Sequence, residues 1–72
     1  MKTAMLNKII DDGEKITLMD GSVWSINPGD TPTVCTWIPT AEIEISESND
    51  SVFDHILTNK NIGVSVNAMK LS

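Results

Sequence analysis

Two glutamates in this chain of 72 residues have a spacing that could support catalysis. Glu42 and Glu44 are two positions apart, and on one face of a strand their carboxylates would be separated roughly like the pair of a glycoside hydrolase. The alternation Glu42-Ile43-Glu44-Ile45 explains both more simply, as the solvent face of a half-buried strand. Neither glutamate has the apolar neighbours that a general acid needs, so we assign them no catalytic role.

Cys35 and His55 are the only cysteine and the only histidine, and they would form a nucleophile and base if the fold brought them together. Asp54 lies beside His55 in the sequence. No base and no glycine elbow accompanies Cys35, so we predict a buried or half-buried structural thiol. His55 is predicted to be a surface or pairing residue. The sequence therefore predicts no catalytic residue and no enzyme.

The run Asp11-Asp12-Gly13-Glu14 offers the oxygen ligands that Ca²⁺ prefers. A calcium loop also needs ligands spaced over about twelve residues and a terminal bidentate glutamate, and this frame is missing. The run is therefore predicted to be a hairpin turn with solvated flanks. We predict no metal site and no cofactor.

Trp24 and Trp37 are the strongest candidates for binding, because an indole can stack on a sugar or a proline-rich peptide as readily as it fills a core. The chain has only three aromatic residues, so packing of both indoles in the core or at its rim is the favoured interpretation. The alternative is that at least one of them belongs to a partly exposed aromatic binding surface.

The charge of the chain narrows the choice of partner. Ten acidic residues stand against five lysines and no arginine, which gives a net charge of -5. This balance repels phosphate backbones, so nucleic acid is not a predicted partner, and anionic small molecules are disfavoured as well.

No apolar run approaches the length of a membrane-spanning helix, and residues 1–10 lack the pattern of an export signal. We therefore predict no membrane span and a cytoplasmic location. The alternative is an exported protein whose native chain carries a signal that this sequence does not contain.

The elements that would position these residues are short strands in one domain, residues 1–72, because turn residues recur about every ten positions. The strands are predicted near 4–11, 14–19, 22–27, 42–45, 55–58 and 62–68. Asp12-Gly13 and Asp20-Gly21 are typical of two-residue hairpin turns. The predicted core residues are Ile43, Ile45, Ile62, Val64 and Val66.

One segment departs from the strand pattern. Thr31 before Pro32 is typical of a helix start, which predicts a short helical turn near 32–37. At helical spacing Val34, Trp37 and Ile38 would share one side, and the tryptophan would cover an end of the barrel. Pro39 would end the turn.

Several short motifs occur together in this sequence: Asp20-Gly21-Ser22 with Trp24, Pro28-Gly29-Asp30, Trp37 with Pro39, and Leu57-Thr58-Asn59 with Gly63. From about residue 14 onward the chain resembles small bacterial β-barrel proteins of unassigned function with this DGSxW, PGD, WxP and LTN pattern. Where those proteins tend to have Pro-Gly after the second tryptophan, this chain has Pro39-Thr40, so the resemblance does not carry a glycine turn to that position. The resemblance implies a compact β-barrel and no site residues.

The sequence thus predicts an all-β fold, a small open barrel of five or six short antiparallel strands, Src-homology-like or OB-like. Its predicted function is a protein or peptide interaction module that binds through a groove or by adding a strand to an exposed edge. The alternative is a structural protein that assembles with copies of itself through exposed strand edges, as Sm-like barrels do.

Overall fold

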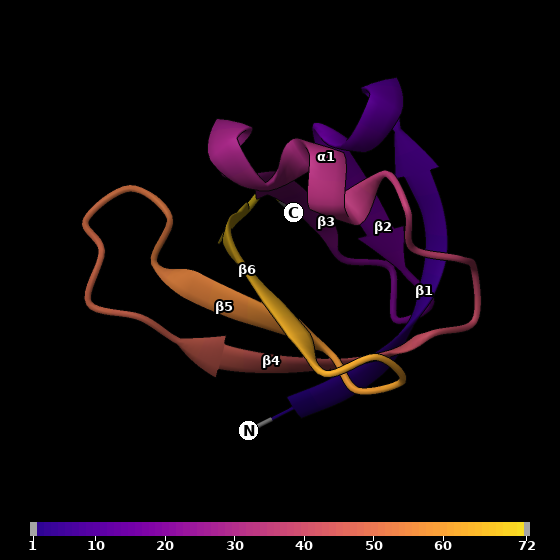
Figure 1. Cartoon of the computed structure of the whole chain (residues 1–72). Coiled ribbons are helices and arrows are strands. Elements are labelled where there is room, and N and C mark those ends of the chain that lie inside the picture. The colour runs from indigo at the N-terminus through magenta and orange to yellow at the C-terminus, as the bar shows by residue number, and fades with distance from the viewer. Residues whose placement is uncertain (1, 72) are drawn as a thin grey trace.

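The computed structural model describes residues 2–71, which fold as six antiparallel strands that form one barrel (Figure 1). The strands are β1 (Lys2–Ile10), β2 (Lys15–Leu18), β3 (Val23–Ile26), β4 (Glu42–Glu47), β5 (His55–Asn59) and β6 (Val64–Lys70). Their order around the barrel is β1-β2-β3-β6-β5-β4, and β1 pairs with β4 to close it. The predicted all-β barrel is confirmed, and the sheet is closed where an open barrel was expected.

Closure changes what the strand edges can do. Each strand between residues 2 and 71 has a hydrogen-bonded neighbour on both sides. A closed barrel has no edge strand that could accept a partner along its whole length. The geometry therefore gives little support to strand addition and to edge-to-edge assembly.

The strand β1 makes closure possible because it changes partner along its length. Its first half pairs with β4, from Lys2 opposite Ile45 to Met5 opposite Glu42. Its second half pairs with β2, and the register shifts at a bulge between Leu6 and Lys8. A bulge bends a strand and increases its twist, which lets β1 turn from one side of the barrel to the other.

The core lies inside the barrel and follows the alternation of the strands. Its buried residues are Leu6, Ile16, Leu18, Trp24, Ile26, Val34, Trp37, Ala41, Ile43, Ile45, Leu57, Val66 and Ala68. The predictions for Ile43, Ile45 and Val66 are confirmed, and Val64 packs against the core while partly buried.

The prediction for Ile62 is wrong, since its side chain is 56% exposed. The turn between β5 and β6 extends through Gly63, and the backbone N–H groups of Ile62 and Gly63 both donate to the carbonyl of Asn59. Ile62 therefore belongs to the turn and not to the strand.

One end of the barrel is covered by three short turns, η1 (Asp11–Gly13), η2 (Pro28–Asp30) and α1 (Thr31–Val34) (Figure 1). Gly13 lies against α1, where a Cβ atom would be 2.5 Å from the carbonyl oxygen of Thr31. Its φ of 102° is also one that glycine adopts readily. The turns can therefore approach each other only because residue 13 has no side chain.

The predicted helical turn is present, and its Val34 and the following Trp37 are buried. The expectation that Ile38 shares their side is wrong, because the helix has ended and Ile38 is 67% exposed. No helix in residues 2–71 has the length and apolar character needed to cross a bilayer.

The hairpin turns are longer than predicted. Between β2 and β3 the N–H of Gly21 donates to the carbonyl of Leu18, and the N–H of Leu18 donates to that of Ser22. This is a three-residue loop with Gly21 at a φ of 91°. Between β1 and β2 the loop has four residues, Asp11 to Glu14, and its first two also have positive φ.

Pro39 and Thr40 form a turn whose geometry favours glycine. The N–H of Ala41 donates to the carbonyl of Ile38, so Pro39 and Thr40 are the two central residues. Thr40 has a φ of 73°, as in a type II turn, where the second central residue is usually glycine. A β-branched residue is strained there because its Cβ crowds the backbone.

We therefore expect Thr40→Gly to stabilise the protein. Removing the Cβ relieves about 1–2 kcal/mol of strain, and the greater freedom of glycine in the unfolded chain costs about 0.5–1 kcal/mol. The free energy of unfolding, measured with urea, should rise by up to about 1.5 kcal/mol. The control is Thr3→Gly in the extended part of β1, which should lower it. Destabilisation by Thr40→Gly would show that Thr40 is not strained.

Candidate functional site

Both tryptophans that were candidates for an aromatic binding surface lie in the core. The exposed fraction of Trp24 is 2% and that of Trp37 is 4%. Trp24 points inward from β3, and Trp37 follows α1 at the covered end of the barrel. Neither indole forms an exposed aromatic surface, because the small barrel uses both rings to fill its interior.

Trp24 is held by a short chain of hydrogen bonds that ends in a carboxylate. Its indole Nε1 donates to the Oγ of Ser22 at 2.8 Å, and that hydroxyl donates to Oδ1 of Asp20 at 2.6 Å. The backbone N–H of Ser22 donates to the same oxygen at 2.9 Å. The hydroxyl bond first, and the backbone bond second, hold the pKa of Asp20 below its ordinary value of 3.8. Asp20-Gly21-Ser22 therefore orients the indole from the β2–β3 turn.

Trp37 differs from Trp24 in its polar atom. Its indole Nε1 is buried and has no hydrogen-bond partner among residues 2–71. A buried donor without a partner lowers stability relative to one that is hydrogen-bonded. The two indoles thus fill similar space, and only that of Trp24 gains a polar contact.

This difference predicts unequal effects of the same substitution. Trp24→Phe and Trp37→Phe remove equal volume, but only Trp24→Phe removes a hydrogen bond. We expect Trp24→Phe to lower the free energy of unfolding by about 1 kcal/mol more than Trp37→Phe does. Urea unfolding followed by circular dichroism measures both variants. An equal or larger loss for Trp37→Phe would contradict the assignment of the two N–H groups.

The Asp20 contact also predicts a pH dependence. Because the pKa of Asp20 is lowered in the folded state, the ionised form favours folding above about pH 3.8. This contribution is lost as the pH falls through the lower, folded-state value. The difference in unfolding free energy between wild type and Asp20→Asn should therefore shrink as the pH falls below about 4. A difference that stays constant over that range would exclude the contribution.

The remaining candidates from the sequence do not form a catalytic group. Glu42 and Glu44 lie on the outer face of β4, as predicted. Cys35 is exposed at the end of α1, so its prediction as a buried or half-buried thiol is wrong. Nδ1 of His55 lies 2.8 Å from Oδ1 of Asp54, which confirms it as a pairing residue. No hydrogen bond within residues 2–71 joins Cys35 to His55. No group of three or more potential metal ligands was found among these residues.

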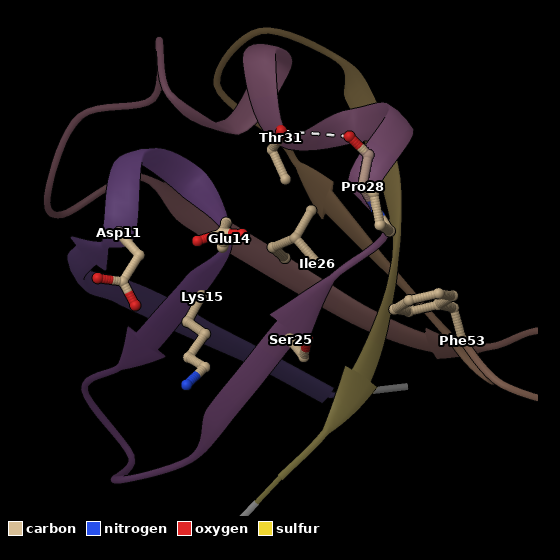
Figure 2. Close-up of a pocket in the computed structure, with 8 residues that line it drawn as sticks. All are labelled: Asp11, Glu14, Lys15, Ser25, Ile26, Pro28, Thr31 and Phe53. Carbon is tan, nitrogen blue, oxygen red and sulfur yellow. Dashed lines mark hydrogen bonds between the residues drawn. The ribbon is translucent and has the colours of Figure 1, made fainter.

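A groove of about 370 Å³ lies where the barrel wall meets the covering turns (Figure 2). We call it the Phe53 groove; its lining residues are Asp11, Glu14, Lys15, Ser25, Ile26, Pro28, Thr31 and Phe53. Lys15 and Ser25 are directly opposite each other on the outer faces of β2 and β3. The backbone N–H of Ile26 donates to the carbonyl of Glu14 at 2.8 Å, which fixes the turn beside the wall.

The turns also fix the far wall of this groove. The Asn27 side chain accepts a hydrogen bond from the N–H of Gly29, and the Thr31 hydroxyl donates to the carbonyl of Pro28 at 3.2 Å (Figure 2). These bonds hold the ring of Pro28 at the groove. The lining of the groove combines apolar side chains with a charged rim, which consists of Asp11, Glu14 and Lys15.

Phe53 comes from the long loop between β4 and β5, and Figure 2 shows its ring directed toward Ser25. Oδ1 of Asp50 accepts hydrogen bonds from the N–H groups of Val52 at 2.8 Å and Phe53 at 2.9 Å. These two bonds, with that of Val52 the stronger influence, lower the pKa of Asp50 below its ordinary value. Asp50 thereby shapes the loop that carries the aromatic ring.

A second hollow, of about 450 Å³, is lined by Lys2, Ile45, Ser46, Glu47 and His55. We call it the β4-end hollow. The rings of His55 and Trp24 pack in a T-shaped arrangement with 5.1 Å between their centroids. Ile45 is its single aliphatic lining residue, and the other lining residues are polar or charged, so this hollow has no apolar aromatic anchor comparable to Phe53. Binding sites combine apolar anchors with a few polar groups, which favours the Phe53 groove.

The sequence interpretation did not identify this groove. Phe53 is the only phenylalanine, and it lies in the polar stretch Ser46 to Asp54. The signal that could have found it is an aromatic residue three positions after an aspartate, where the aspartate can cap the loop backbone. Its proximity to Pro28 could not be read from the sequence, because 24 residues, which include α1 and β4, separate them.

Comparison of the chain with protein-family models, with curated proteins and with solved structures found no match in any of the three. The resemblance to small bacterial β-barrel proteins stays a prediction. Evidence about function comes from the geometry of the groove itself.

Proposed function

We propose that the protein is an interaction module that binds a segment of a partner protein in the Phe53 groove. The observation that carries this proposal is the position of Phe53. The hydrophobic core contains both tryptophans, whereas Phe53 is absent from the core cluster and lines a surface groove. In so small a chain, a large aromatic side chain kept out of the core is available for binding.

The shape of the groove suits a peptide side chain. Ile26 is almost fully buried and forms the floor, while the rings of Pro28 and Phe53 stand at its sides (Figure 2). An apolar side chain of the partner placed between these rings would lose contact with water on several faces. Polar groups around the rim would hydrogen-bond the adjoining backbone, as in other peptide-binding grooves.

The experiment is selection from a random peptide display library on immobilised wild-type protein, repeated on Phe53→Ala. Removal of a central aromatic anchor typically costs about 2 kcal/mol or more, so enriched peptides should bind Phe53→Ala at least roughly tenfold more weakly. The matched control is Val52→Ala, which changes an exposed neighbour in the same loop that does not line the groove. Circular dichroism checks that all three proteins are folded.

Peptides that bind wild type and Val52→Ala but lose affinity for Phe53→Ala would support the proposal. Enriched peptides with equal affinity for all three proteins would contradict it, because binding would then not involve the groove. A selection that enriches no peptide would contradict it as well.

A further inference from the structure

We infer that the segment bound in the Phe53 groove is basic, with an apolar side chain followed or preceded by lysine or arginine; this inference rests on the proposed function. The groove has an uneven distribution of charge. Asp11 and Glu14 line it with two carboxylates, and Lys15 is its single cation. All three side chains are exposed and can meet a ligand.

The carboxylates of the groove form no ion pair with another described residue. In the described part of the chain, the one ion pair joins Asp54 to His55, so Asp11 and Glu14 have no ion-pair partner there. A ligand cation beside them would gain attraction without displacing an existing pair. Lys15 opposes this attraction in part, and the groove still has one more negative than positive side chain.

The acidic and apolar parts of the groove are separate. Figure 2 shows Asp11 on the side opposite Phe53, with Glu14 and Ile26 between them. One side chain of a ligand cannot satisfy both parts. An extended segment that places an apolar residue at Phe53 would therefore carry its positive charge a few residues away, at Asp11 and Glu14.

The net charge of the whole chain also favours a basic ligand. A net charge of -5, with no arginine, produces a field that attracts cationic segments and repels anionic ones before contact. This field would increase the rate of encounter, while the groove carboxylates would act on the bound state. The experiment has to separate these two effects.

The test uses the same display library on wild type and on the double variant Asp11→Asn/Glu14→Gln. Asparagine tolerates the positive φ of residue 11, so the turn is expected to persist. The matched control is Glu42→Gln/Glu44→Gln, which changes the net charge equally on β4, away from the groove. One peptide enriched on wild type is then synthesised with its charged positions all lysine, all glutamine or all glutamate, and fluorescence anisotropy measures the affinities.

We expect peptides selected on wild type to be enriched in lysine and arginine. The lysine version should bind wild type roughly two- to fivefold more tightly than the glutamine version at low salt. The glutamate version should be weakest. This preference should fall in Asp11→Asn/Glu14→Gln, persist in Glu42→Gln/Glu44→Gln, and weaken as salt is added.

The outcomes distinguish this inference from the proposed function. Peptides that depend on Phe53 but show no preference for lysine would overturn the inference and leave the groove as the binding site. An equal loss of preference in both double variants would also overturn it, because net charge alone would then explain the effect. Binding that does not depend on Phe53, or a selection that enriches no peptide, would overturn both the inference and the proposed function.

Discussion

The pairing of β1 with both β2 and β4 is the constraint on which the rest of this structure depends. In this sheet of six short strands β1 closes the barrel by pairing with β4 through its first half and with β2 through its second, and the bulge between Leu6 and Lys8 bends the strand between the two. Closure gives every inward side chain a place in one small core and satisfies the backbone of strands that would otherwise be edges. Without disulfides or a structural metal among its described residues, a 72-residue chain depends on this pairing and packing.

Closing the wall leaves the ends of the barrel, and three short turns cover one of them. At one end Gly13 lets η1 approach α1, and Val34 and Trp37 fill the space beneath with apolar side chains. Elsewhere Trp24 depends on a polar contact, through Ser22, to fix its indole. The two tryptophans thus support the same core by different means, one mainly by packing and the other by packing and hydrogen bonding.

The features that could be predicted from sequence are those set by local pattern. Recurring turn residues indicated the six strands, and period-two alternation placed Ile43, Ile45 and Val66 in the core. The errors occur where the chain turns. Ile62 fits the alternation of β6 but belongs to the preceding turn, which is defined by backbone hydrogen bonds to Asn59. Thr40 adopts a positive φ that its residue type disfavours, because the surrounding strands fix the geometry of the turn.

The Phe53 groove could not be predicted for a related reason, since it forms where the barrel wall, the covering turns and the loop between β4 and β5 meet in the folded chain. Part of its lining lies outside the core. The side chain of Phe53 is not part of the core cluster. Asp50 orders the loop that carries it by accepting hydrogen bonds from the backbone N–H groups of Val52 and Phe53. Asp11 and Glu14 are exposed and make no ion pair within residues 2–71. Residues in such positions can change without loss of the core, so Phe53, Asp11 and Glu14 can vary while closure is retained.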